Sequence, residues 1–384
     1  MDIVFQDGPE HFTLKPLSLT RPVADLRIGI LTIAEKWSKI LDADNFSYAT
    51  VNHLKKKFPE KIGELHIRGG LLPSKDLIDA IRILNDGERL ISGDEWLAHR
   101  NGDISVEFNG NYKLVKRPDN LFTWNKEELE SDFDLLTSGR QSEPIPISNK
   151  TFGSRIFIEK GAIVEASILN SISGSIYLAR GSEIMEGSIV RGGFSLGEFS
   201  TLKAGAKIYG ATTVGPFSKV GGEVNNSIIW GFSNKGHDGF LGNSVLGQWC
   251  NIGAGSSNSN LKNNYDEVKL YSYVSGSFES TDLTFCGLIM GDHSKCAINT
   301  SFNTGTVVGV SCNIFGAGFP RNFIPDFSWG GPQGNMEYAI EKALATAKRM
   351  MSRREVSFNE MESDILSAVH AQTSELRGGM SLAN

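Results

Sequence analysis

The chain has 384 residues, of which 40% are hydrophobic and 21% are charged, and its formal net charge at pH 7 is −6. This length favours two or more domains of a globular protein. The acidic balance argues against a dedicated nucleic-acid-binding protein, and no apolar run is long enough to cross a membrane. The first residues do not resemble a signal peptide, so we expect a cytoplasmic protein without a membrane partner.

Residues 1–145 are predicted to form an α/β domain. Apolar residues recur with helical spacing over 28–41 and over 75–85. Short apolar runs at 65–67 and 89–91 have the length and composition of strands. This alternation of helices and strands predicts a layered, Rossmann-like α/β fold.

A six-residue repeat dominates residues 151–330. From Leu178 to Val220 a branched aliphatic residue occupies every sixth position, and a mostly small residue lies two positions before the next one. This period fits neither a helix, at about 3.6 residues, nor a single strand, at about 2, and it is typical of a β-helix whose coils hold about 18 residues. The aliphatic positions of the first block are Leu178, Ile184, Val190, Leu196, Leu202, Ile208, Val214 and Val220, and the register returns from Met290 to Ile314. We expect these side chains to fill a narrow prism.

Residues 331–384 are predicted to form a helical tail. Gly330-Gly331-Pro332 ends the repeats, and apolar residues then follow helical spacing from Met336. Ser357 to Glu360 matches a capping box, which predicts the start of a second helix. We expect the tail helices to pack on a coil or on a neighbouring subunit.

Two glycine-rich segments lie between the two repeat blocks. Residues 234–242 contain His237, and residues 251–255 follow nine residues later. Histidine ordinarily titrates near neutral pH, so a histidine in an irregular segment is a candidate general base, and Glu223 is the candidate for orienting its ring. A structural or solvated histidine is the alternative.

Four runs within the repeats resemble the bifunctional glucosamine-1-phosphate acetyltransferase/N-acetylglucosamine-1-phosphate uridyltransferase family, in an alternative branch. These are Ser233 to Gly242, Asn251 to Tyr265, Gly291 to Thr300 and Phe315 to Arg321. The resemblance implies a left-handed parallel β-helix and a homotrimer with an acetyl-transfer site near subunit boundaries.

The same resemblance implies roles for individual residues. His237 matches the general base that deprotonates the amine of the sugar phosphate, and Glu223 matches its supporting carboxylate. Ala254 matches a backbone N–H that faces the thioester oxygen of acetyl-CoA. Phe240 and Asn225 stand where the better-known branch has a tyrosine and a lysine, so Lys269 or Lys235 is the candidate replacement cation. The other predicted substrate contacts are Lys203, Phe240, Asn251 and Asn260, and the other predicted acetyl-CoA contacts are Ser294, Ala297, Ala317 and Arg321.

The N-terminal part resembles the sugar nucleotidyltransferase-like domain of that branch through Leu17 to Gly29 and Thr32 to Trp37. Such an enzyme needs cations and backbone N–H groups around phosphates, and a carboxylate for Mg²⁺. The usual glycine-rich loop is missing, so Arg21, Arg27 and Lys36 are the predicted cations. Asp94 follows a glycine and is interpreted as a turn residue, so no metal ligand is assigned. Both an active domain that uses Mg²⁺ and a degenerate domain remain open.

The leading hypothesis is an acetyl-CoA-dependent N-acetyltransferase of glucosamine 1-phosphate. If the N-terminal domain is active, uridylyl transfer from UTP would give UDP-N-acetylglucosamine for the cell envelope. The alternatives are a sugar-1-phosphate nucleotidyltransferase with the β-helix as an oligomerisation scaffold, and a non-enzymatic sugar-nucleotide-binding regulatory subunit.

Overall fold

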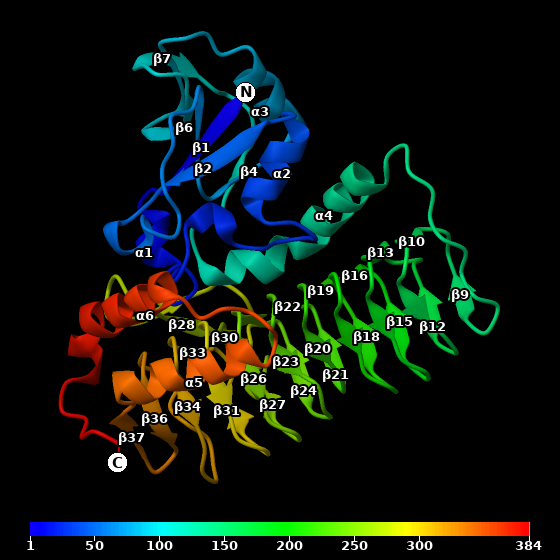
Figure 1. The fold of residues 1–384 in the computed structure, drawn as a ribbon, viewed down its shortest axis with the longest axis vertical. Coiled ribbons are helices and arrows are strands. Elements are labelled where there is room, and N and C mark those ends of the chain that lie inside the picture. The colour runs from blue at the N-terminus through cyan, green and yellow to red at the C-terminus, as the bar shows by residue number, and fades with distance from the viewer. Residues whose placement is uncertain (384) are drawn as a thin grey trace. The chain divides into compact units, whose positions relative to one another are not determined.

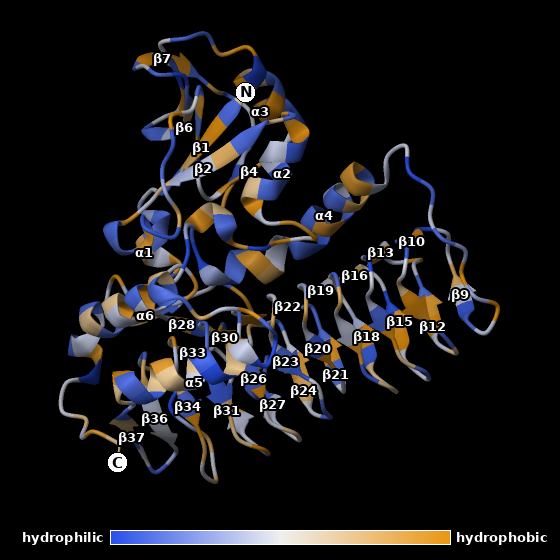
Figure 2. Ribbon diagram, in the orientation of Figure 1, coloured by the Kyte–Doolittle hydropathy of each residue, from blue (hydrophilic) through white to orange (hydrophobic). Residues whose placement is uncertain are grey.

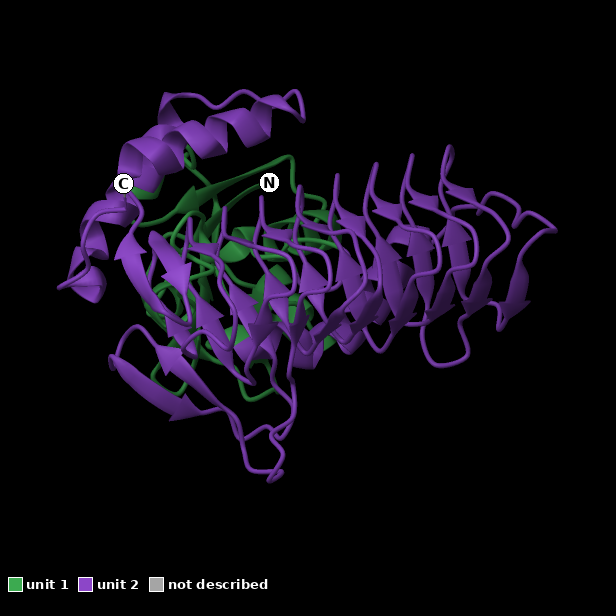
Figure 3. Cartoon of the chain, turned by 90° about the horizontal axis from the view of Figure 1, so that it is seen from below, with its two compact units in different colours: residues 1–27, 31–118 green, residues 28–30, 119–384 purple. Residues whose placement is uncertain are grey.

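The computed structural model describes residues 1–383 and divides into two compact units. The first unit comprises residues 1–27 and 31–118, and the second comprises residues 28–30 and the chain from 119 on (Figure 3). Helix α4 (Pro118–Thr137) thus belongs almost entirely to the second unit. No helix among the described residues is long and apolar enough to span a membrane.

The first unit is an α/β domain, as predicted (Figure 1). Its six-stranded sheet has the order β2-β1-β3-β6-β5-β7, with β1 parallel to both β2 and β3. The strands are β1 (Asp2–Gln6), β2 (Asn45–Ala49), β3 (Leu65–Arg68), β5 (Glu88–Ser92), β6 (Glu95–His99) and β7 (Ile104–Glu107), and β4 (Leu71–Leu72) pairs separately with β8 (Lys113–Leu114). The helices are α1 (Glu10–Thr13), α2 (Ile33–Ile40) and α3 (Lys75–Arg82).

Helix α2 begins five residues later than the apolar spacing predicts. The Thr32 hydroxyl accepts a hydrogen bond from the Glu35 N–H at 3.2 Å, and the Glu35 carboxylate accepts one from the Thr32 N–H at 2.7 Å. This capping box satisfies backbone N–H groups that have no partner within a helix, so it sets the helix start at Ile33. Residues 28–30 group instead with the second unit.

The second unit is a left-handed β-helix with three sheet faces, which confirms the predicted fold class. The first face holds β10 (Ile156–Ile158), β13 (Ile176–Leu178), β16 (Phe194–Leu196), β19 (Thr212–Val214), β22 (Ile228–Ile229), β25 (Val245–Leu246), β30 (Leu288–Met290), β33 (Thr306–Val308) and β35 (Phe323–Ile324). The second holds β11 (Ile163–Val164), β14 (Glu183–Ile184), β17 (Thr201–Leu202), β20 (Lys219–Val220), β23 (Asn234–Lys235), β26 (Asn251–Ile252), β31 (Lys295–Cys296), β34 (Asn313–Ile314), β36 (Ser328–Gly331) and β37 (Gly334–Glu337). The third holds β9 (Lys150–Phe152), β12 (Ile168–Asn170), β15 (Ile189–Arg191), β18 (Lys207–Tyr209), β21 (Glu223–Asn225) and β24 (Phe240–Gly242).

Two further strand pairs belong to the same unit. β27 (Ser257–Asn258) pairs with β32 (Ser301–Phe302) in parallel, and β28 (Lys269–Ser272) pairs with β29 (Ser277–Ser280) as a hairpin inserted into the coil. All strand pairs that join successive coils are parallel, whereas the inserted hairpin is antiparallel.

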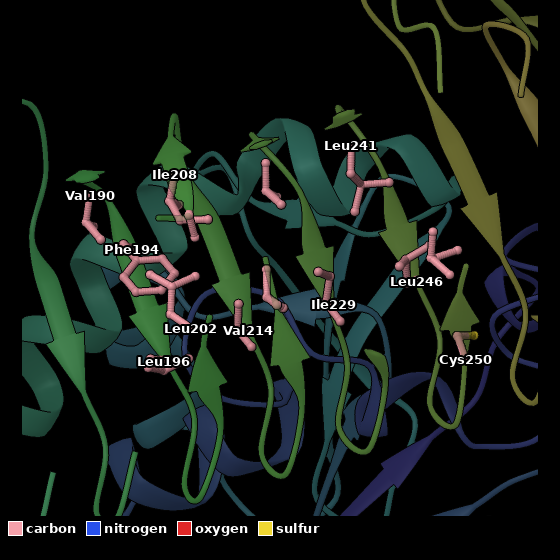
Figure 4. Close-up of a cluster of buried hydrophobic side chains, with 14 of the residues drawn as sticks. Val190, Phe194, Leu196, Leu202, Ile208, Val214, Ile229, Leu241, Leu246 and Cys250 are labelled. Atoms are coloured by element: carbon pink, nitrogen blue, oxygen red, sulfur yellow. The ribbon is translucent and has the colours of Figure 1, made fainter. Parts of the chain in front are cut away.

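The core of the coil consists of the predicted aliphatic side chains. All eight positions of the first repeat block are at most 1% exposed, and Figure 4 shows five of them, from Val190 to Val214, on successive strands. Figure 2 shows hydrophobic and hydrophilic residues mixed along these strands, as expected when one strand face meets the core and the other is outward. The four cysteines, Cys250, Cys286, Cys296 and Cys312, are buried free thiols.

The tail consists of α5 (Ile340–Ser352) and α6 (Glu360–Gln372). Residues 334–337 form β37 instead of the first helical turn, because they pair antiparallel with β36. The capping-box prediction was wrong by two positions: the N-cap of α6 is Asn359, whose side chain accepts a hydrogen bond from the Glu362 N–H at 3.1 Å.

Candidate functional site

The glycine-rich break at residues 236–239 connects β23 on the second face of the coil to β24 on the third. His237 and Asp238 are exposed there. Gly239 has a φ of +124°, and a Cβ on it would lie 2.0 Å from the Ser256 carbonyl oxygen. Only glycine fits this close approach of neighbouring coils, so the break folds tightly and leaves the His237 side chain accessible.

Several predicted residues lie along one edge of the coil, where strands of the second face end. We call this the strand-end edge. Lys203 follows β17, His237 follows β23, Ala254 follows β26, Ala297 follows β31 and Ala317 follows β34. These strands follow one another in one sheet, except that β20 lies between the strands of Lys203 and His237, so the five residues follow the same edge of the coil.

A polar and aromatic group borders the break on the third face. Glu223 lies directly beside Phe240 in the β21–β24 register, and both side chains are outward and half-buried. A Cβ on Gly242 would lie 2.5 Å from Phe240 Cζ and 2.7 Å from Asn260 Nδ2, so these two side chains meet above Gly242. The structure therefore brings Glu223, Phe240 and Asn260 together.

The partner of Glu223 is a residue that sequence reasoning missed. Tyr209 Oη donates a hydrogen bond to Glu223 Oε1, and this bond, together with burial, raises the pKa of Tyr209 to about 12. Among the described residues, Glu223 makes no hydrogen bond to His237. Tyr209 lies fourteen residues before Glu223 on the neighbouring strand β18, where the register pairs Glu223 with Lys207 and Tyr209 with Asn225. The contact is therefore diagonal, and the register of the third face would have shown only that the two residues lie on neighbouring strands.

Asn251 lies on a different face. It is on β26, where the Asn234 side chain donates to it at 3.5 Å, and Asn234 in turn accepts a hydrogen bond from Arg354 Nη2 at 2.9 Å. His237 thus lies at the junction between the face of Asn251 and the face of Phe240 and Asn260.

The other three predicted contacts, Ser294, Lys269 and Arg321, lie away from His237 and its neighbours on the strand-end edge. Ser294 is fully buried, and its hydroxyl donates to the Gly309 carbonyl at 2.6 Å and accepts from the Cys312 N–H at 2.9 Å. Lys269 is exposed in the inserted hairpin, and Arg321 is exposed in the segment before β35. None of these three lies on the strand-end edge.

The first unit has a pocket at the carboxyl ends of β1 and β2. It is lined in part by Asp7, His11, Thr50, Lys55 and Glu60. Asp7 is held by the Val23 N–H, which donates to its Oδ1 at 2.8 Å, and by the Thr50 hydroxyl, and His11 Nδ1 lies 3.0 Å from its Oδ2. Ligands of open α/β sheets bind outside the carboxyl ends of the strands, which makes this pocket the candidate nucleotide site.

The predicted cations do not line that pocket. Arg21 Nη1 lies 3.0 Å from Asp25 Oδ2, in a site where burial raises the pKa of Asp25. Arg27 lies 3.7 Å from Glu35, and Lys36 is only 1% exposed.

Asp94 is exposed in the turn between β5 and β6, as the turn interpretation predicted. Among residues 1–383 no cluster of three or more His, Cys, Asp or Glu could hold a metal ion.

Comparison with known proteins gives relatives for both units. Residues 3–141 match the family model described as sugar nucleotidyl transferase. The chain is 26% identical over 325 residues to a bifunctional protein GlmU of Methanocaldococcus jannaschii, covering 82% of this chain and 69% of that protein. It is 26% identical over 189 residues to a bifunctional sugar-1-phosphate nucleotidylyltransferase/acetyltransferase of Sulfurisphaera tokodaii, covering 49% of this chain and 46% of that protein.

A solved UDP-N-acetylglucosamine acyltransferase of Francisella novicida is 12% identical, with a TM-score of 0.32, and the match covers 60% of this chain and 94% of that one. The chain spans about two thirds of the first curated relative and less than half of the second. Residues 3–141 are therefore similar to sugar nucleotidyl transferases, and the chain as a whole is similar to the bifunctional nucleotidyltransferase/acetyltransferase proteins that its sequence motifs indicated.

Proposed function

We propose that the β-helix transfers the acetyl group of acetyl-CoA to the amine of glucosamine 1-phosphate. The observation that carries this proposal is the strand-end edge, where the exposed His237 lies in line with the turns of Ala254 and Ala297 and beside Phe240 and Asn260. A general base can take the proton of the amine, small residues leave room for CoA, and polar and aromatic side chains can contact the sugar.

In this mechanism the neutral imidazole of His237 accepts a proton from the amino group as its nitrogen attacks the thioester carbon. A C–N bond forms, the C–S bond breaks, and the CoA thiolate takes the proton from the His237 imidazolium and leaves as the free thiol. The Ala254 N–H donates no hydrogen bond within the described chain, while the Ala254 carbonyl accepts one from the Asn299 N–H at 2.8 Å. This free donor in an otherwise fixed turn supports its role in stabilising the thioester oxyanion.

The sugar is assigned to the side of the break that holds Phe240 and Asn260, with Lys203 on the same edge as the candidate phosphate contact. The Glu223 carboxylate, held by Tyr209, would contact the sugar hydroxyls or the His237 ring from the adjacent strand. Asn251 would act from the second face of the coil. CoA would lie along the turns of Ala297 and Ala317, with Arg321 as a further contact and Lys269 kept as a candidate cation for the sugar phosphate. Ser294 is not part of this proposal, because its hydroxyl is buried and hydrogen-bonded within the coil.

We further propose that the active form is a homotrimer. Ile168 and Ile189 are exposed and lie next to each other in the β12–β15 register of the third face. Adjacent exposed aliphatic residues on a flat face are suited to burial against another copy of the chain.

For the N-terminal domain we propose uridylyl transfer from UTP to the acetylated sugar phosphate. The two carboxylates that line the pocket, Asp7 and Glu60, are those that would hold Mg²⁺ together with the substrate phosphates, and Lys55 is the lining cation. When bound, Mg²⁺ would neutralise the phosphate charge; Thr50 and the Val23 N–H would keep Asp7 oriented.

The test is an assay with glucosamine 1-phosphate, acetyl-CoA, UTP and Mg²⁺ that records free thiol and pyrophosphate separately. We expect thiol release that requires the amino sugar and pyrophosphate release that requires UTP. Thiol release that is absent with glucosamine 1-phosphate would overturn the acetyl-transfer proposal, and absent pyrophosphate release would overturn the uridylyl-transfer proposal.

A further inference from the structure

A lysine occupies a core position of the β-helix directly before the break. Lys235 lies opposite Val220 in the β20–β23 register and is 1% exposed. The neighbouring inward positions on this face, Leu202, Val220 and Ile252, are aliphatic. The Lys235 side chain therefore points into the prism instead of toward solvent.

The surroundings of this ammonium group are mostly apolar. A small cavity at Lys235 is lined by Leu241, Ile252, Leu288 and Phe302, together with Asn258 and two serines. Burial lowers the pKa of Lys235 to about 8, partly offset by Asp238 in the break and by the Cys296 thiol. Burying a charge costs free energy unless it is paired, so a core lysine is expected to have a role that an aliphatic residue could not fulfil.

Among residues 1–383 the Lys235 side chain makes one hydrogen bond, and its acceptor lies in the proposed catalytic segment. Nζ donates to the backbone carbonyl of His237, two residues ahead. A charged donor makes a stronger hydrogen bond than a neutral one. The bond therefore links the backbone of the exposed His237 to a side chain that is buried in the core.

We propose that Lys235 is a positioning residue, whose ammonium group holds the break from inside the coil and thereby presents His237 to the substrate. This inference rests on the proposed acetyl transfer for its consequence in catalysis, but not for the conformation of the break. As pH rises through about 8, Lys235 loses its charge and the bond to the His237 carbonyl weakens.

The test compares wild type with Lys235→Met, which keeps an unbranched side chain of similar length in the core. Lys295→Met is the matched control, since Lys295 Nζ also donates to a histidine carbonyl, that of His293 at 2.6 Å, and burial lowers the pKa of Lys295 to about 8 as well. The first readout is amide hydrogen exchange of residues 236–241 at pH 7 and pH 9, corrected for intrinsic rates.

We expect exchange of this segment to be at least 10-fold faster in Lys235→Met at pH 7, with the rest of the coil unchanged. In wild type and in Lys295→Met the segment should lose protection between pH 7 and pH 9, whereas Lys235→Met should show no such change. Equal protection of residues 236–241 in both variants, or the same change with pH in all three proteins, would overturn the proposal.

The second readout is acetyl transfer. Lys235→Met should lower kcat by about 10- to 100-fold, because a misplacement of about 1 Å can cost about 10²-fold, while the KM for acetyl-CoA stays unchanged. Its kcat should also lack the decline above pH 8 expected for wild type. If wild type shows no acetyl transfer, the proposed function fails, and hydrogen exchange still decides whether Lys235 holds the break.

Discussion

Asp326 is a buried carboxyl group whose ionisation should reduce the stability of the fold. Its Oδ1 accepts a hydrogen bond from the Val310 N–H at 2.6 Å, and its Oδ2 accepts one from Tyr273 Oη at 3.0 Å. Burial nevertheless raises the pKa of Asp326 from its ordinary value of 3.8 to about 6, against the opposing effects of both hydrogen bonds and of Arg377. The apolar surroundings thus outweigh the groups that favour the charged form.

The size and sign of the effect follow from linkage. A pKa raised by about 2 units corresponds to about 3 kcal/mol. The folded state binds this proton more tightly than the unfolded state, so stability contributed by the protonated form is present below about pH 4 and is lost as pH rises to about 6. At neutral pH the ionised carboxylate therefore lowers the free energy of unfolding by roughly that amount.

Asp326→Asn removes the charge and keeps the shape. The amide oxygen can still accept from the Val310 N–H, and the amide nitrogen can donate to Tyr273 Oη. We expect the free energy of unfolding to increase by up to about 3 kcal/mol at pH 7.5 and to be nearly unchanged at pH 4. Urea unfolding followed by tryptophan fluorescence at several pH values measures this difference.

The control is Asp79→Asn, the same chemical change at an exposed position of α3, which should alter the free energy of unfolding by less than about 0.5 kcal/mol at any pH. The reasoning is refuted if Asp326→Asn is less stable than wild type at pH 7.5, or if its advantage does not shrink as the pH falls toward 4.

Three further outcomes are expected. His237→Ala should lower kcat for acetyl transfer by about 10²–10⁴, with little change in the KM for acetyl-CoA, since a general base acts in the chemical step; near-wild-type turnover at pH 7 would remove His237 from the mechanism. Leu202→Ala should lower the free energy of unfolding by about 2–5 kcal/mol, because a fully buried side chain leaves a cavity, and urea unfolding checks this. Lys55→Met should reduce UTP-dependent pyrophosphate release and leave thiol release unchanged, because Lys55 lines the pocket of the first unit; equal loss of both signals would argue against two separate sites.

Local sequence patterns predicted the architecture because they reflect local geometry. A six-residue repeat places one inward side chain on each short strand of a coil, so the positions from Leu178 to Val220 could be assigned to the core without coordinates. Where a choice depended on a single hydrogen bond the pattern was insufficient: Asn359, and not Ser357, caps helix α6, since its side chain reaches the Glu362 N–H.

The sequence by itself determined that the chain has an α/β part, a six-residue coil and a helical tail, and it identified the motifs around His237. Only the tertiary structure decided which residues share a surface. The step from Val220 to its coil neighbour Lys235 is fifteen residues instead of about eighteen, so the repeat could not reveal a lysine in the core. Likewise, Arg21 and Arg27 carry the charge that a phosphate site needs, but the fold places Lys55 and not these two arginines at the pocket of Asp7. Periodicity reports on which side of a strand a residue lies, whereas a site depends on how separate coils and loops are brought together.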